Sequence, residues 1–285
     1  MPEGDSVHRL ARRLDARLAG RRVVRSDLRH PRLVGADLAG RHVIGHDTHG
    51  KHLLTRFSAA DRSGGSAGSD EAPPLTLHSH LRMDGEWTVT RPGRRLPARL
   101  GHEVRLVLAL DDGATVWGLR LHDLALVPTR DERRLLAHLG PDPLREDWDA
   151  AEAARRLLAD PAVPLAAALL DQRRVAGFGN LWANELCFLA GVSPWTPVGE
   201  VDVPALLERG AAMLRRSATV PGAHQVTTGS RRRGNEHWVT GRVRQGCLRC
   251  GGPVRVAAEV PGDPARRRTW WCPACQPGPG PTDGR

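Results

Sequence analysis

Four cysteines near the end of the sequence place the strongest constraint on what this chain can fold into. Cys247 and Cys250 form one C-x2-C pair, and Cys272 and Cys275 form a second pair, with 21 residues between the pairs. Each C-x2-C turn directs two thiolates at one ion, so the two pairs predict a tetrahedral four-thiolate zinc site. A closed four-sulfur shell leaves no open position. We therefore expect one structural Zn²⁺ in a small C-terminal module, residues 241–276, with a β-hairpin between the pairs.

Two disulfide bonds are the alternative for these four cysteines. The N-terminal stretch MPEGDSVHRLARRL lacks the apolar segment of a secretory signal, and disulfides are rare in cytoplasmic proteins. No apolar run approaches the ~18 residues that cross a membrane, so we expect a cytoplasmic protein. The fifth cysteine, Cys187, lies in an apolar helical stretch and is predicted to be a core residue rather than a nucleophile.

The charge of the chain indicates its kind of partner. The net charge is +10 and the pI is about 10.9, and such a basic surface attracts nucleic acid first and acidic membranes second. A general arginine bias without function is the alternative. However, residues 241–276 contain seven arginines against two acidic residues, and this uneven distribution favours a phosphate-binding module.

Hydrophobic periodicity predicts the secondary structure. Apolar residues recur every three or four positions from Val7 to Leu18, so a helix is expected over residues 5–19. Alternating patterns over residues 22–128 predict strands, with a hairpin turn just before Lys51. Four helical patterns follow residue 145. The chain is therefore expected to be a multidomain α+β protein.

Composition shifts mark the expected domain boundaries. The polar, Gly-rich segment 58–74 is expected to be a mobile surface loop, and the Gly- and Arg-rich segment 223–240 to be flexible on its own. The expected order is a mostly β domain over residues 1–128, a linker over 129–144, a helical domain over 145–240, the C-terminal module over 241–276 and a disordered tail over 277–285.

Lys51 is the only lysine among 42 lysines and arginines. Chance survival of one lysine under an arginine bias is one explanation. The other is a position where arginine fails, because a guanidinium is a planar fork that is never deprotonated, whereas lysine is a compact, titratable point charge.

Pro2 and Glu3 form a candidate catalytic pair, with the alternative that the proline has no function, as in most proteins that start this way. We expect removal of the initiator methionine, which would make Pro2 the N-terminal residue. An α-amino group titrates near 8, against about 10.4 for lysine, so more of it is a free nucleophile at neutral pH. An amine nucleophile forms an imine with the aldehyde carbon of a sugar, and the neighbouring carboxyl of Glu3 is suited to general acid/base catalysis.

Six short motifs follow one another along nearly the whole chain. They are PEGDSVHR at the start, GKHLL around Lys51, HLRMDG at 80–85, LGPDPL at 139–144, LLDQRRVAGFGNLWANEL at 169–186 and RRTWWCPACQ at 267–276. In this order they resemble the formamidopyrimidine-DNA glycosylase/endonuclease VIII family of base-excision repair enzymes. The first motif is similar to the endonuclease VIII branch. The resemblance implies an N-terminal β-sandwich with a leading helix, a helix-two-turn-helix domain and a C-terminal β-hairpin zinc finger.

The resemblance also implies a bifunctional DNA glycosylase and AP lyase. Pro2 would attack C1′ of a damaged nucleotide, Glu3 would protonate the sugar ring oxygen, and the resulting iminium would permit β- and δ-elimination. Lys51, Asn180 and Arg267 would hold and neutralise the flanking phosphates. Arg267 stands five residues before the third cysteine of the zinc site, and its arginine neighbours leave a one-residue ambiguity.

The target base must leave the stack, so the gap needs a wedge. The resemblance assigns Met83 to this role, with core packing as the alternative. It assigns Arg120 to the orphaned base and Glu185 to the bottom of the site. Two departures from the family concern lesion preference: Asp84 is a poor wedge residue beside Met83, and Thr240 replaces a tyrosine common in the family.

We expect the chain to act as a monomer on oxidised pyrimidines in duplex DNA, associated with the nucleoid when bound and without membrane partners. Excision of oxidised purines by the same chemistry is the alternative within the family. A non-catalytic zinc-finger DNA-binding protein is the alternative outside enzymes. A general RNA-binding protein fits less well, because the tryptophans are scattered rather than grouped with basic residues.

Overall fold

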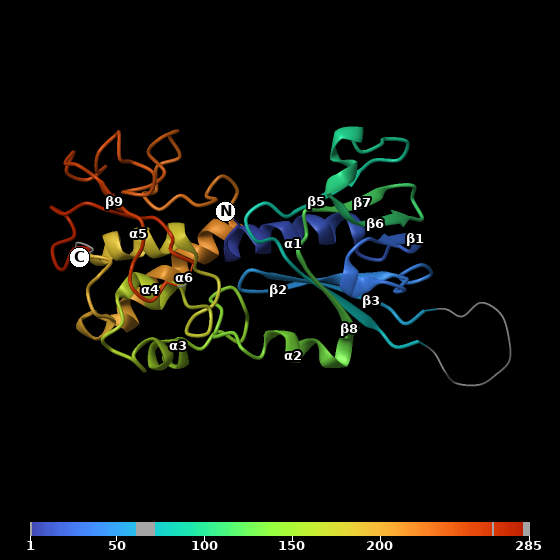
Figure 1. Ribbon diagram of the computed structural model, residues 1–285, viewed down its shortest axis with the longest axis horizontal. Helices are drawn as coiled ribbons and strands as arrows, with labels where there is room; N and C mark the ends of the chain where they lie inside the picture. Colours follow the sequence, from blue (N-terminus) through green and yellow to red (C-terminus); the bar gives the residue numbers. More distant parts are fainter. Residues whose placement is uncertain (1, 61–71, 264, 282–285) are drawn as a thin grey trace, which may run out of the picture. The chain divides into compact units, whose positions relative to one another are not determined.

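The structure is a computed structural model that describes residues 2–60, 72–263 and 265–281 (Figure 1). The chain divides into two compact units. Unit 1 consists of Met1–Pro2 and Val7–Ala137, and unit 2 consists of Glu3–Ser6 and His138–Arg285. Most of the predicted mobile loop, residues 61–71, and the last four residues of the predicted tail lie outside the described residues.

Unit 1 is built from two four-stranded antiparallel sheets, with strand orders β1-β6-β7-β5 and β2-β3-β4-β8 (Figure 1). One face of the leading helix packs in the core of this unit. The strands are β1 (Val23–Leu28), β2 (Val43–His49), β3 (His52–Phe57), β4 (Leu75–His80), β5 (Glu86–Thr90), β6 (Val104–Leu110), β7 (Thr115–Leu119) and β8 (Asp123–Pro128); the helices are α1 (Gly4–Leu18), α2 (Glu132–Leu136) and the 3₁₀ helices Pro31–Leu33, Ala98–Glu103 and Thr129–Asp131.

Alternation within the strands explains how this unit is stabilised. In β3 and β4, Leu53 and Leu77 are fully buried in the core, whereas His52 and His78 lie on the other face of the sheet. Each buried aliphatic side chain contributes roughly 1.5–3 kcal/mol. The alternation in the sequence places apolar side chains on the inner faces of the sheets, and the burial of these side chains stabilises the packing of the two sheets.

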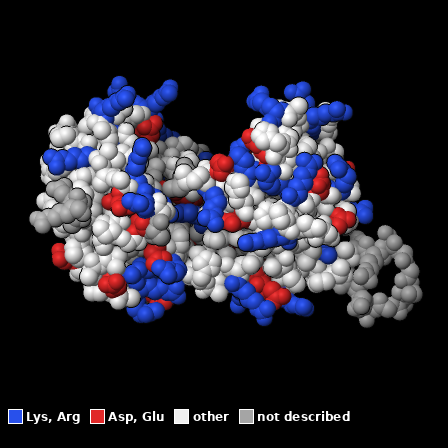
Figure 2. Space-filling view, viewed as in Figure 1, with Lys and Arg blue, Asp and Glu red and all other residues white. Residues whose placement is uncertain are grey.

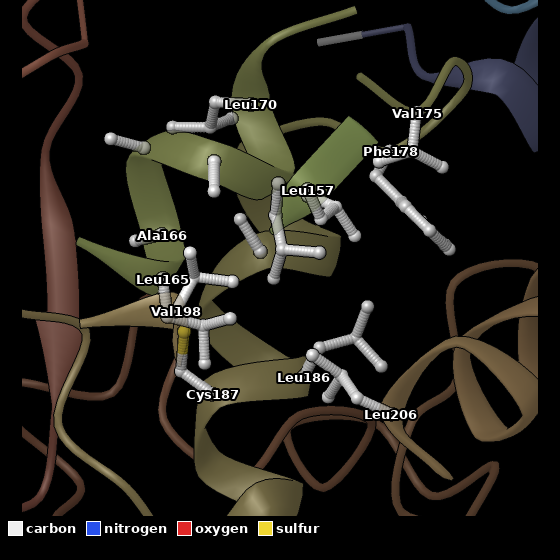
Figure 3. Packing of buried hydrophobic residues seen from close by; sticks show 14 of the residues in the cluster. Leu157, Leu165, Ala166, Leu170, Val175, Phe178, Leu186, Cys187, Val198 and Leu206 are labelled. Carbon is white, nitrogen blue, oxygen red and sulfur yellow. The ribbon is translucent and has the colours of Figure 1, made fainter. Parts of the chain in front are cut away.

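Unit 2 contains the helices predicted after residue 145. Trp182 and Phe178 are fully buried members of its main hydrophobic cluster. Figure 3 shows part of this cluster, including Leu157, Phe178 and Leu186. Cys187 lies among these apolar side chains, as predicted, and burial raises the pKa of its thiol. The helices are α3 (Ala150–Leu157), α4 (Leu165–Leu170), α5 (Asn180–Ala190) and α6 (Val203–Thr219), with a 3₁₀ helix at Val198–Glu200.

The C-terminal module contains the expected hairpin, formed by β9 (Arg255–Ala257) and β10 (Thr269–Trp271). The described part of the predicted tail contacts the helical domain, because Ser193 donates hydrogen bonds to the carbonyls of Pro277 and Pro279. None of the helices formed by the described residues has the length and hydrophobicity that a membrane crossing requires.

Candidate active site

Glu3 is held at the N-terminus of α5. Its carboxylate is buried and accepts hydrogen bonds from the backbone N–H groups of Gly179 (3.0 Å) and Leu181 (2.8 Å), with Trp182 N at 3.4 Å. A helix N-terminus stabilises a carboxylate because its first N–H groups lack partners in the helix. A Cβ at position 179 would lie 2.6 Å from the Glu3 Oε1 atom, so this position needs glycine.

Two glycines fix the backbone beside Glu3. Gly4 N donates to Gly177 O at 2.9 Å, and a Cβ on Gly4 would lie 2.8 Å from the Gly177 Cα. Asp5, fully buried, accepts a hydrogen bond from the hydroxyl of Ser217 at 2.5 Å. These contacts make residues 3–6, which directly follow Pro2, part of unit 2. Sequence reasoning missed Asp5 and Ser217; a polar residue in the first turn of a helix was the available signal.

Asn180 is the first residue of α5. Its Nδ2 donates to the carbonyl of Arg268 at 2.8 Å, and its Oδ1 is buried without a hydrogen-bond partner among the described residues. Farther along the same helix, Asn184 Oδ1 accepts a hydrogen bond from Trp270 N at 2.9 Å. These bonds join β10 and the residues before it to the start of α5, where Glu3 is also bound.

Arg267 is half-buried and paired. Its backbone N and its Nη1 donate to the carboxylate of Asp263 at 2.8 Å and 2.6 Å. Arg266 pairs instead with Glu259 and is exposed. Both arginines therefore have a carboxylate partner, and Arg267 differs from Arg266 in its partial burial and in the backbone contact with Asp263.

Glu185 is fully buried in α5. Its carboxylate accepts hydrogen bonds from the backbone N–H groups of Trp238 (2.8 Å), Val239 (3.1 Å) and Thr240 (2.9 Å), and from the Thr227 hydroxyl (2.5 Å). These contacts are with polypeptide, so any effect of Glu185 on DNA would be indirect. They also fasten the two ends of the segment that the sequence predicted to be flexible.

The predicted hairpin is present as β2–β3, and Lys51 lies with Gly50 in its turn, whereas the sequence pattern predicted it just after the turn; the residue is half-buried. The positive charge near Lys51 affects the pKa of His80. Burial, then the nearby positive charges of Arg82 and Lys51, lower the pKa of His80 to about 4. The ring is therefore neutral at neutral pH, beside two cations.

Met83 lies at the tip of a tight turn and its side chain is 68% exposed. It does not pack in the core, so the alternative of core packing is wrong. Two residues earlier, Leu81 is buried in the core of the sandwich. Arg120, in contrast, is surrounded by carboxylates of Asp84, Glu86 and Glu103.

The four cysteines of the C-terminal module form a tight cluster. Their sulfur atoms all lie within 4.8 Å of one another, with Cys247 and Cys275 at 3.8 Å and Cys250 and Cys272 at 3.6 Å. A tetrahedron with metal–sulfur bonds of about 2.3 Å has sulfur–sulfur edges of about 3.8 Å. The cluster is therefore suited to holding one metal ion.

Comparison with known proteins identifies the family. Residues 1–125 match the formamidopyrimidine-DNA glycosylase N-terminal domain, and residues 139–220 match the formamidopyrimidine-DNA glycosylase H2TH domain. The chain belongs to the formamidopyrimidine-DNA glycosylase/endonuclease VIII family. The predicted resemblance and the predicted fold class are thereby confirmed.

Relatives place the chain within this family. It is 46% identical to a probable endonuclease 8 2 of Streptomyces coelicolor, across 100% of this chain and 97% of the relative. It is 39% identical to a DNA-(apurinic or apyrimidinic site) lyase of Mycolicibacterium smegmatis, across 97% and 99%. A Lactococcus lactis formamidopyrimidine-DNA glycosylase, crystallised with DNA containing N7-benzyl-Fapy-dG, has the same fold, with a TM-score of 0.74 at 24% identity, covering 97% of this chain and 100% of that one.

The chain is an endonuclease VIII-like bifunctional DNA glycosylase and AP lyase of base excision repair. Within unit 2, this family member gathers Glu3, Asn180 and the Arg267–Arg268 segment around the start of α5. Pro2, Lys51, Met83 and Arg120 belong to unit 1. Their joint action on one nucleotide stays a prediction.

Proposed function

We propose that Pro2 is the nucleophile of this enzyme and that the substrates are oxidised pyrimidines in duplex DNA. The Pro2 amine attacks C1′, and the bond from C1′ to the base breaks, so that the base leaves with a proton. Loss of a proton from C2′ of the iminium then expels the 3′ phosphate, and a second elimination expels the 5′ phosphate. Glu3 enters this step as the protonated acid, gives its proton to the ring oxygen as the sugar opens, and is left as the carboxylate.

The observation that supports this proposal is the binding of the Glu3 carboxylate at the N-terminus of α5. A buried carboxylate held by three backbone N–H groups at a helix N-terminus, one residue after Pro2, has a fixed orientation. Fixed orientation is what an acid/base group needs to act on a covalently held sugar. The glycine contacts on either side keep residues 3–6 from shifting.

Phosphate binding falls to Lys51, Asn180 and Arg267, with Met83 as the wedge. Positive charge supports a DNA partner: the net charge is +10, and Figure 2 shows Lys and Arg side chains scattered over the face in view, with Asp and Glu side chains between them. The exposed tip of Met83 supports insertion into a stack. We also propose domain boundaries at residues 128, 144, 240 and 276. The proposed helical domain, residues 145–240, and the C-terminal module, residues 241–276, both lie inside unit 2.

We infer that the metal is Zn²⁺, held by Cys247, Cys250, Cys272 and Cys275. Four thiolates at the observed spacing suit zinc, and a shell closed by four protein ligands supplies structure rather than chemistry. The ion fixes the hairpin that carries Arg267.

Borohydride trapping tests the nucleophile. Without its initiator methionine, the chain has two amines, the Pro2 α-amine and the Lys51 side chain. We expect borohydride to trap a covalent adduct with a thymine glycol duplex, and peptide mapping to locate it on Pro2. Pro2→Gly or an N-terminal tag should abolish trapping while duplex binding persists. An adduct on Lys51 would contradict the proposal.

Excision of oxidised purines is the second candidate, because formamidopyrimidine-DNA glycosylases share the fold. The same assay with 8-oxoguanine duplexes separates the two. Faster release of the oxidised purine than of thymine glycol would assign the chain to purine repair, with the Pro2 chemistry unchanged.

A further inference from the structure

The loop that carries Met83 is a closed turn. Gly85 N donates to the carbonyl of Leu81 at 2.8 Å, and a Cβ at position 85 would lie 2.5 Å from that same oxygen. Leu81 anchors one end of the loop in the core, while Met83 points outward. The exposed tip therefore keeps its shape only if the turn beneath it stays closed.

Arg82 holds the first side of this loop. It has a φ of +52, which is unfavourable for a residue with a side chain. Its backbone N donates to His80 Nδ1 at 3.0 Å, and its guanidinium pairs with Asp123. The neutral ring of His80 is the acceptor that the backbone N–H requires.

Arg120 holds the second side. It also has a left-handed φ, +50, and its Nε donates to the carbonyl of Asp84 at 2.8 Å. Its other nitrogens are bound by carboxylates: Nη1 pairs with Glu103, and Nη2 lies 3.3 Å from Glu86. The backbone N of Arg120 donates to the carbonyl of Glu103 at 2.8 Å, so Glu103 fixes both ends of this residue.

We propose that Arg120 is a positioning residue that braces the Met83 loop and promotes base opening through Met83, not by contacting the orphaned base. The proposal rests on the wedge role of Met83 proposed above. One guanidinium faces three carboxylates here, so the group attracts no phosphate. Three of its five N–H donors bind Asp84, Glu86 and Glu103, and these contacts fix the plane of the guanidinium against the loop.

The two roles of Arg120 predict opposite responses to Glu103. If Arg120 braces the loop, Glu103→Gln weakens the brace and slows base release. If Arg120 contacts the orphaned base, Glu103→Gln frees the guanidinium and does not slow base release. Glu103 thus tests the brace without removing Arg120, and it serves even if an Arg120 variant folds poorly.

The experiment measures single-turnover base release from a thymine glycol duplex and strand cleavage at a preformed abasic site opposite each of the four bases. We expect Arg120→Gln to slow base release about tenfold and Glu103→Gln to slow it about threefold. Cleavage at the abasic site, where no base has to leave the stack, should fall less than threefold for both variants, and the ranking of the four opposite bases should stay that of the parent. Arg130→Gln, which removes an exposed arginine of unit 1, is the charge control and should match the parent.

A double-variant cycle decides the route of action. Arg120→Gln in a Met83→Ala background should cost nothing further, because the brace has no wedge left to position. Multiplying effects, a changed ranking of opposite bases, or faster release by Glu103→Gln would overturn the proposal. If Met83→Ala releases the base normally while Pro2 trapping persists, the brace proposal fails and the proposed chemistry stands.

Discussion

The β-sandwich of unit 1 and the C-terminal region of unit 2, residues 227–276, are stabilised by different means. Among the described residues, the main cluster of the sandwich buries 21 hydrophobic side chains. The separate cluster that includes the C-terminal region has five buried members, of which Phe188 comes from α5 and two are cysteines of the four-sulfur cluster. A small cluster of this kind cannot offset the entropy of ordering so long a segment.

Side chains that bind several partners at once stabilise this region in place of a large hydrophobic core. The four cysteines converge on one point, and the Glu185 carboxylate gathers the backbone at Trp238–Thr240. Trp271 adds one anchor by packing edge-on against Trp195, with ring centroids 4.7 Å apart. The region that carries Arg267 thus depends on specific chemical groups, while the sandwich depends on buried area.

Metal removal should separate the two regions most strongly. Binding of a structural zinc ion supplies about 10 kcal/mol of folding free energy, so a strong chelator should unfold the C-terminal module and abolish strand incision. Hydrogen exchange should rise across residues 241–276 and stay unchanged in the sandwich. Added zinc should restore both protection and incision. Unchanged exchange in the metal-free chain would show that the module has another source of stability.

Replacing Glu185 with alanine tests how much the Glu185 carboxylate contributes to the stability of this region. The change leaves the N–H groups of Trp238, Val239 and Thr240 without their acceptor in a buried place, at a cost of about 4 kcal/mol. Denaturant unfolding should show this loss, and hydrogen exchange should rise over residues 227–240. Glu208→Ala, at an exposed position of α6, is the matched control and should change stability by less than about 0.5 kcal/mol.

A cavity in the sandwich should produce the converse pattern. Leu106 is fully buried in β6, the strand between β1 and β7, and Leu106→Ala should cost about 3 kcal/mol by loss of transfer free energy and creation of a cavity. Exchange should rise in the strands of unit 1, and zinc content should not change. Val24→Ala, at an exposed position of β1, supplies the control. A loss of zinc in the Leu106 variant would contradict the separation.

The smallest effect concerns pH. Burial lowers the pKa of His80 to about 4, whereas an unfolded histidine titrates near 6.5. Between these values the unfolded state binds more protons, so the stability of unit 1 should rise with pH from about 4 to 6.5, by at most about 1 kcal/mol per pH unit after allowance for partial exposure. Burial lowers the pKa of His46 in the same direction. His80→Gln should reduce the slope of the profile, and His46 should account for part of the slope that is left; an unchanged profile would assign it to other groups.

Sequence patterns predicted the local features of this molecule and missed the contacts between distant segments. The C-x2-C pairs, the leading helix and the Lys51 hairpin are local, because spacing within a few residues determines them. The partners of Arg120 come from positions 84, 86 and 103, which approach one another only when β5, β6 and β7 pair. The sequence therefore indicated an arginine at this place without showing that carboxylates surround it.

The contact between Gly4 and Gly177 has a consequence for how such a chain can evolve. Backbone meets backbone there, so even a methyl group at position 4 has no space. A substitution at position 4 would push the Glu3 carboxylate away from the start of α5, and no change at position 177 could compensate, because glycine is already the smallest residue. Position 177 is restricted for a different reason: its φ of +95° is one that residues with a side chain rarely adopt, and a Cβ there would face Asp142 and Leu214 at 3.4 Å. Two sites far apart in the sequence are thus closed to mutational drift, one by close contact and the other by backbone conformation.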